Sequence, residues 1–173
     1  MKIIAFAGSN SKNSINKKLV TYATSLFNNA SVEILDLNDF EMPLFSVDTE
    51  KTIGQHPLAK AFLAKIAEAD WVVVSLAENN KNFSTAFKNV FDWCSRINVK
   101  VFQQKPMFLM ATSPGARGGA NVLEIAKNNF PHYGAEIKGT FSLPSFDENF
   151  DIENGKISNV VLDGDLKEII KSF

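Results

Sequence analysis

Cysteine is nearly absent from this chain of 173 residues, and the single Cys94 excludes an internal disulfide. Histidine is as scarce: His56 and His132 are isolated, with no metal-ligand spacing around them. No apolar run reaches the length of a membrane-spanning helix, and the one that follows Met1 is too short for a signal peptide. We therefore expect a cytoplasmic protein with no metal and no membrane partner.

The chain also has almost no net charge. The 18 basic and 19 acidic side chains leave a net charge of −1, so no basic surface for nucleic acid is expected. The chain shows no repeat, low-complexity tract or linker, and its length fits one domain over residues 1–173. Such a domain can bury a core without a disulfide or a metal to support it.

Short apolar runs alternate with amphipathic stretches along the chain. The apolar runs predict strands at 2–7, 31–37, 70–77, 105–113 and 135–143. Helical spacing of apolar residues predicts helices across 15–26, 58–66, 83–97 and 120–130, and a short one at 165–173, whereas 38–55 reads as irregular. Because parallel strands need long crossovers, this alternation indicates an α/β fold with a parallel sheet between two layers of helices.

Ligands of such sheets bind at the carboxyl ends of the strands, which directs attention to the loops at 8–16, 77–84 and 112–119. The first loop, "GSNSKNSIN", lacks both the dinucleotide fingerprint and the P-loop. Its hydroxyls, the Asn16 amide, the Lys12 charge and the start of the next helix suit a phosphate. Taken alone, the loop reads better as a turn in which Ser14 caps a helix.

The other two loops carry the same ambiguity. "AENNKNFSTAFKN" is amide-rich and leads into a helix that Asn82 or Ser84 could cap. "ATSPGARGGAN" holds three glycines in five residues, which permits close approach of a ligand or simply a glycine-rich entry to a helix. Three such loops at one edge favour a ligand site. No Ser-His-Asp set or metal cluster accompanies them, and Cys94 reads as a core thiol.

Taken together, "GSNSKNSINKKL", "AENNKNFSTAFKNVFDW" and "ATSPGARGG" resemble the loops of the NAD(P)H-dependent FMN reductases, which include chromate, quinone and azo-dye reductases. "MPLF", Asp48 and "FDIENGK" extend the resemblance over nearly the whole chain. It implies a flavodoxin-like three-layer sandwich with strand order 2-1-3-4-5. It also implies a homodimer or homotetramer that passes electrons from NAD(P)H through bound FMN to a small acceptor: a quinone, an azo compound, free flavin or a metal oxyanion.

The resemblance also implies which residues bind the flavin, which carries the chemistry without a catalytic residue of the protein. The phosphate would be held by Ser9, Ser11, Lys12, Ser14, Ile15 and Asn16. The ring would lie beside Glu78, Asn79, Asn80, Ser113, Gly115, Gly118 and Gly119, with Leu44 and Phe45 close to the flavin or to a partner subunit.

Three positions depart from the family pattern: Ser11 stands where the family has Arg, and Ala77 and Asn79 stand where it has Pro and Tyr. Two alternatives follow. One is a flavodoxin-like electron carrier, against which the net charge of −1 argues, because such carriers are acidic. The other is a family member that keeps the fold and binds flavin weakly or not at all.

Overall fold

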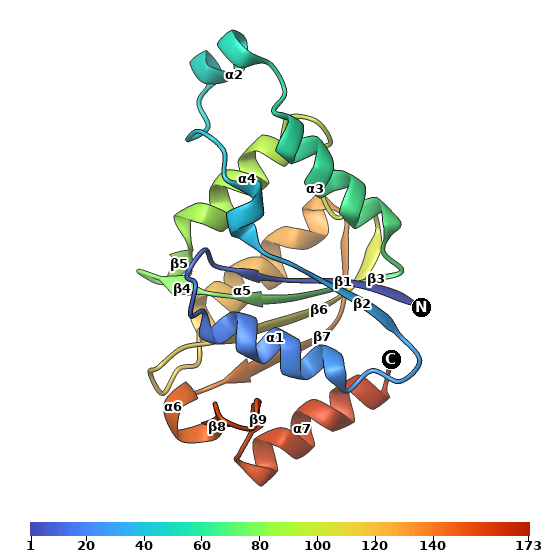
Figure 1. Ribbon diagram of the computed structural model, residues 1–173, viewed down its shortest axis with the longest axis vertical. Coiled ribbons are helices and arrows are strands. Elements are labelled where there is room, and N and C mark those ends of the chain that lie inside the picture. The colour runs from blue at the N-terminus through green and yellow to red at the C-terminus, as the bar shows by residue number, and fades with distance from the viewer.

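A five-stranded parallel sheet forms the centre of the computed structural model, which describes residues 1–173 (Figure 1). Its strands lie in the order β2-β1-β3-β6-β7. They are β1 (Lys2–Gly8), β2 (Ser31–Leu35), β3 (Trp71–Leu76), β6 (Lys105–Thr112) and β7 (Ala135–Leu143). Since β6 and β7 are the fourth and fifth strands of this sheet along the chain, the predicted order 2-1-3-4-5 is confirmed.

Helices cover both faces of the sheet, as predicted (Figure 1). The helices α1 (Ile15–Ser25) and α7 (Val160–Lys171) pack on one face, and α3 (Pro57–Glu68), α4 (Thr85–Ser95) and α5 (Ala120–Asn129) pack on the other. Strand residues alternate between the two cores: Ile4 and Phe6 join the α3–α5 side, whereas Ile3 and Ala5 join the α1–α7 side. Every helix is too short or too polar to span a bilayer.

The helix starts explain several polar residues of the sequence. Ser14 and Ser84 accept hydrogen bonds from the main-chain N–H groups of the third residue of α1 and α4, respectively. Asn159 caps α7 in the same way. This cap places the start of α7 at Val160 rather than at 165, because Val160 and Val161 face solvent and give no buried periodicity.

The segment at 38–55 is more regular than predicted. It contains the short 3-10 helix η1 (Leu37–Phe40) and the helix α2 (Val47–Ile53), which projects from the sheet (Figure 1). Since α2 buries none of its residues, its sequence carries no amphipathic pattern. Strand β2 ends at Leu35, two residues before the predicted end, because η1 begins at Leu37.

Smaller elements follow β3 and β7 where only loops were predicted. After β3 comes the hairpin of β4 (Glu78–Asn79) with β5 (Asn82–Phe83), and after β7 come the helix α6 (Phe146–Asn149) and the hairpin of β8 (Phe150–Asp151) with β9 (Lys156–Ile157). A 3-10 helix, η2 (Phe130–Tyr133), lies between α5 and β7. Two-residue strands lie below the length at which alternation can be recognised in a sequence.

Candidate functional site

The three predicted loops begin side by side at one edge of the sheet. Gly8, the last residue of β1, pairs with Leu76, the last residue of β3, and Leu76 in turn pairs with Ala111 near the end of β6. A further bond joins the Ser84 hydroxyl to the Gly8 carbonyl oxygen, at 2.8 Å. Parallel pairing therefore brings together segments that are far apart in the chain.

The first loop ends in a helix start that can accept an anion. The Ser14 hydroxyl receives the Lys17 N–H at 3.1 Å, so the predicted cap is present. The main-chain N–H groups of Ile15 and Asn16, the first two of α1, have no partner within the protein. The first turn of α1 also contains no acidic residue. Capping and anion binding are thus compatible here, and the site fits a phosphate.

The Asn16 side chain differs from the prediction, because it turns away from the loop and into the protein. Its Oδ1 accepts the Thr112 N–H at 3.0 Å and the Ser75 hydroxyl at 2.7 Å, and its Nδ2 donates to the Thr112 carbonyl at 3.1 Å. The residue is only 2% exposed. Its amide therefore fastens α1 to β3 and β6, and only its main-chain N–H remains without a partner at the helix start.

The loop after β3 is a tight hairpin whose tip is exposed. Asn80 and Lys81 have φ values of 51° and 63°, which is the left-handed pair of a two-residue primed turn. Asn79 and Asn80 are both exposed, so their side chains are free for a ligand.

Glu78, at the base of this hairpin, is used by the protein itself. Its two carboxylate oxygens accept the Asn121 side-chain amide at 2.9 Å and the Val122 N–H at 3.0 Å, in the first turn of α5. Burial acts to raise the pKa of Glu78. The hydrogen bonds from Asn121 and Val122 and the nearby Arg117 outweigh it and hold the pKa below its ordinary value. Glu78 thus caps α5 as an anion.

The glycine-rich loop is only partly the open wall that was predicted. Gly118 and Gly119 are buried, with φ values of 55° and 77°. A Cβ on Gly118 would lie 2.8 Å from the backbone of Leu143 and Pro144, and one on Gly119 would lie 2.9 Å from the Ala111 Cβ. These two glycines allow the loop to pack on the sheet. Gly115 is exposed and Ser113 is half-buried, so both remain accessible to a ligand.

Beside the first two loops lies a cavity of about 390 Å³. The first loop, the 37–44 segment, β4 and the start of α4 contribute to its lining. Among the lining residues, Asn79 was expected beside the flavin ring, and Leu44 was expected close to the flavin or to a partner subunit. Asn10, Asn38, Thr85 and Asn89 were missed, because they lie on three segments, the first loop, η1 and α4, that meet only in the fold.

Asn89 and Trp93 hold the segment that forms one side of this cavity. Asn89 Oδ1 accepts the Phe45 N–H at 2.8 Å, and its Nδ2 donates to the Met42 carbonyl at 3.0 Å. Trp93 Nε1 donates to the Pro43 carbonyl at 2.8 Å. This explains the polar members of "FKNVFDW": an amide and an indole N–H on the inner face of α4 signal a main-chain segment that needs hydrogen bonds.

The histidines, the cysteine and the acidic residues of the chain serve structural roles or lie apart from one another. No three His, Cys, Asp or Glu side chains lie together as a metal site would need. His56 caps α3 through Nδ1, which accepts the Leu58 N–H at 3.2 Å. Burial raises the pKa of Cys94 to about 12, so it is a core thiol. What the site provides is a helix start with two unpartnered N–H groups beside exposed amides and hydroxyls.

A doubly wound parallel sheet whose loops gather around such a helix start defines the flavodoxin-like class of α/β proteins. Within that class, the model of the family described as NADPH-dependent FMN reductase matches residues 1–148. The chain belongs to this family. FMN is thus its cofactor and NAD(P)H its electron donor.

Individual relatives agree with the family assignment. An NADPH:quinone oxidoreductase of Arabidopsis thaliana is 28% identical over 180 residues, which cover 100% of this chain and 90% of the relative. A 2-hydroxy-1,4-benzoquinone reductase of Burkholderia sp is 33% identical over 122 residues, which are 69% of this chain and 64% of that protein. Among solved structures, FerB, a flavoenzyme NAD(P)H:(acceptor) oxidoreductase from Paracoccus denitrificans, superposes with a TM-score of 0.77. It is 22% identical, and the match covers 99% of this chain and 93% of that one.

Proposed function

We propose that this protein uses FMN to transfer electrons from NAD(P)H to a small carbonyl acceptor of the quinone kind. The observation that carries the proposal is the pair of unpartnered N–H groups on Ile15 and Asn16, at the sheet edge where the three family loops meet. The family match and relatives named as quinone reductases support it.

The FMN phosphate is placed at the start of α1. The N–H groups of Ile15 and Asn16 donate to its oxygens, and the positive end of the helix dipole adds to the attraction. The other proposed donors share the loop: the hydroxyls of Ser9, Ser11 and Ser14 and the ammonium group of Lys12. Ser14 can donate its proton to the phosphate while its oxygen accepts the Lys17 N–H.

The flavin ring is placed along the rim that the second and third loops form. Asn79, Asn80, Ser113 and Gly115 lie there at or near the surface, whereas Glu78, Gly118 and Gly119 support the rim from below. When bound, FMN supplies the hydride and electron chemistry. The protein contributes binding and orientation, since its hairpin and its glycine-rich loop are fixed by hydrogen bonds rather than by a ligand.

The acceptor is placed in the cavity beside this rim. Of the four asparagines that line it, Asn89 is bonded to the main chain, and Asn10, Asn38 and Asn79 offer amide groups. The apolar lining residues include Phe40 and Leu44, and Glu41 is the one charged lining residue. No Lys or Arg lines the cavity. Amide donors between apolar walls suit a neutral, planar molecule with carbonyl oxygens, such as a quinone, better than an oxyanion.

We further propose that the protein acts as a homodimer or homotetramer in the cytoplasm, where nicotinamide dinucleotides supply reducing power. Leu44 and Val47, on the segment that leads into α2 and at its start, are 72% and 55% exposed. Exposed apolar side chains beside a site are typical of an interface.

Flavin titration tests the proposal. The purified protein should bind FMN with quenching of the flavin fluorescence, and it should then oxidise NADPH when a benzoquinone is added, without a partner reductase. NADPH oxidation that requires a partner reductase would favour an electron carrier. A protein that binds no FMN would be a family member that has kept only the fold, and the proposal would be wrong.

A further inference from the structure

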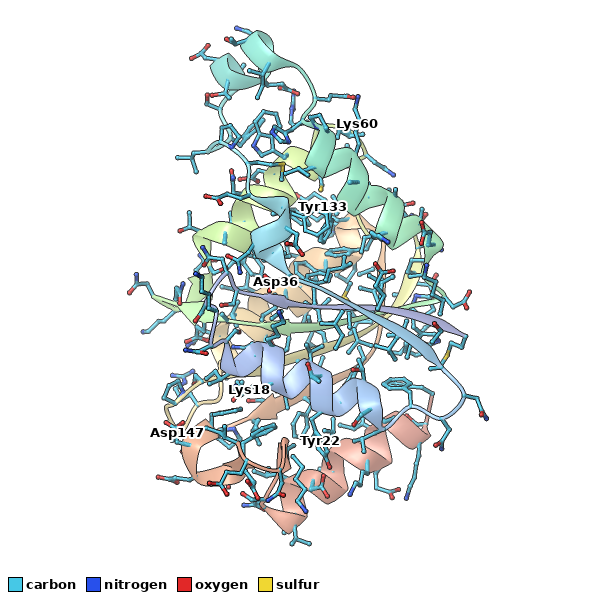
Figure 2. The ribbon with its side chains drawn as sticks, in the orientation of Figure 1. Lys18, Tyr22, Asp36, Lys60, Tyr133 and Asp147 are labelled. Carbon is cyan, nitrogen blue, oxygen red and sulfur yellow. The ribbon has the colours of Figure 1, made fainter.

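A groove of about 330 Å³ lies between α1 and the β8–β9 hairpin, next to the proposed phosphate loop. Ser14, Lys17, Lys18 and Thr21 of the capped helix form one side, and Lys12 joins them from the loop. Figure 2 shows Lys18 on α1, on the side of the sheet that also carries α6 and the hairpin. The groove therefore continues outward from the end of the loop where the FMN phosphate is placed.

The positive charges of this groove are incompletely balanced. Lys17 is paired with Asp36 across the end of β2, and the bond from Lys17 is the main reason that the pKa of Asp36 is lowered. Lys12 and Lys18 make no salt bridge. No Asp or Glu lines the groove, and the Asp151 carboxylate of the hairpin accepts hydrogen bonds from the N–H and the side-chain amide of Asn154.

The position of these lysines on the helix adds a second argument. Lys17 and Lys18 lie in the first turn of α1, close to the positive end of the helix dipole, where cations are unfavourable and anions favourable. No acidic residue in that turn offsets them. A single phosphate monoester at the N–H groups of Ile15 and Asn16 leaves Lys18 without a ligand. The Thr21 hydroxyl, further along the helix, donates to the Lys17 carbonyl and can still accept a hydrogen bond.

The opposite wall of the groove is apolar. It is formed by Phe150 and by Ile152, which is 56% exposed, with Gly155 at the turn of the hairpin. Lysines and hydroxyls facing an apolar wall match a molecule that carries both a phosphate group and an aromatic base, as a nucleotide does. We propose that this groove is a second phosphate site, which binds a phosphate group of a nucleotide in addition to the FMN phosphate.

The phosphate group in the groove could come from either of two parts of a nicotinamide dinucleotide. One is the 2′-phosphate, which only NADPH has, and the other is the pyrophosphate, which NADH and NADPH share. The inference rests on the proposed function only in that FMN fills the neighbouring loop. The test therefore uses the full chain after saturation with FMN, confirmed by the visible absorption of bound flavin. Failure to reach saturation would count against the proposed function, and the binding data that follow concern the groove alone.

The experiment is calorimetric titration of the FMN-loaded protein with inorganic pyrophosphate, with ADP and with 2′,5′-ADP. We expect binding of at least one nucleotide without release of flavin. Lys18→Gln should weaken this binding about tenfold, through loss of one charge-assisted contact. Thr21→Trp, on the exposed face of α1, should weaken it by filling the groove. Lys127→Gln, which removes the same charge at an exposed position of α5, should leave nucleotide binding unchanged.

Tighter binding of 2′,5′-ADP than of ADP would identify the 2′-phosphate end as the occupant, and the reverse order would identify a pyrophosphate. The proposal is overturned if none of the three probes binds, or if Lys18→Gln and Thr21→Trp bind them as Lys127→Gln does. It is also overturned if binding releases FMN, because the probe would then occupy the flavin phosphate loop.

Discussion

Asn16 and Thr112 exchange two hydrogen bonds, side chain to main chain, although 96 residues separate them in the chain. The amide of Asn16 satisfies both the N–H and the C=O of the last residue of β6, and it also accepts the Ser75 hydroxyl from β3. The start of α1 is thereby fixed relative to the two strands whose loops complete the proposed flavin site. Asn16 acts on the site by holding its first loop in place.

Asn16→Ala should destabilise the protein by about 2–4 kcal/mol, because it leaves three buried polar groups without a partner. Asn16→Asp should be no better tolerated, because a carboxylate cannot donate to the Thr112 carbonyl. Urea unfolding measures the change. Asn13→Ala, three residues earlier and exposed, should alter stability by no more than about 0.5 kcal/mol. Equal effects at 13 and 16 would contradict the structural role.

Ile15→Pro tests the placement of the phosphate. Proline is tolerated at the first position of a helix. The residue before a proline favours an extended ψ, and Ser14 already has a ψ of 120°. The substitution removes one N–H that has no protein partner. We expect FMN affinity to fall about tenfold, as for the loss of one charge-assisted hydrogen bond.

Ile15→Ala is the matched control for this change, since it removes the same side chain but keeps the N–H. Fluorescence titration with FMN should give nearly the wild-type dissociation constant for Ile15→Ala. If the proline and alanine variants bind FMN equally well, the phosphate does not lie at this helix start.

Glu78→Gln should lower stability at pH 7 by about 1 kcal/mol, because a carboxylate at the start of α5 is replaced by a neutral group. The folded protein holds the pKa of Glu78 below its ordinary value of 4.5. The stabilisation is therefore complete above that value and is lost as the pH falls through the lower folded-state pKa. Unfolding measured from pH 7 to pH 3 should show the two proteins converging. A difference that stays constant over this range would mean that the charge of Glu78 contributes nothing.

Gly118→Ala should destabilise the protein by at least about 2 kcal/mol. The new Cβ would meet the backbone of Leu143 and Pro144 at 2.8 Å, in a residue whose φ is 55°. At Gly115 a Cβ has no neighbour closer than 4.0 Å, so Gly115→Ala should change stability little. Thermal unfolding compares the two. Similar midpoints for both variants would show that the buried packing of Gly118 is not needed.

The main sheet was predictable because each of its strands is a local apolar run between amphipathic helices. "DWVVVSLA" and "KPMFLMATS" identify β3 and β6 without reference to any distant residue. The same locality explains what was missed. Helix α2 buries nothing, and the hairpin β4–β5 depends on left-handed φ values at Asn80 and Lys81, which a short polar loop does not reveal.

The location of the candidate site could be predicted, but several residue roles could not. The carboxyl edge of a parallel sheet follows from strand order alone. The direction in which Asn16 points, the engagement of Glu78 by α5 and the burial of Gly118 depend on partners 24 to 96 residues away. Asn89 carried a visible signal, an amide on the buried side of a helix, yet its partners Met42 and Phe45 are identified only by the fold.

The central claim is that this chain passes electrons from NAD(P)H through FMN to a quinone-type acceptor. Its most direct test is an anaerobic titration of the FMN-loaded protein with NADPH, followed by a benzoquinone, while the visible flavin absorption is recorded. The proposal predicts that NADPH abolishes the absorption of the bound flavin and that the quinone restores it, with one quinone consumed per NADPH. Flavin that stays oxidised in the presence of excess NADPH and excess NADH would contradict it.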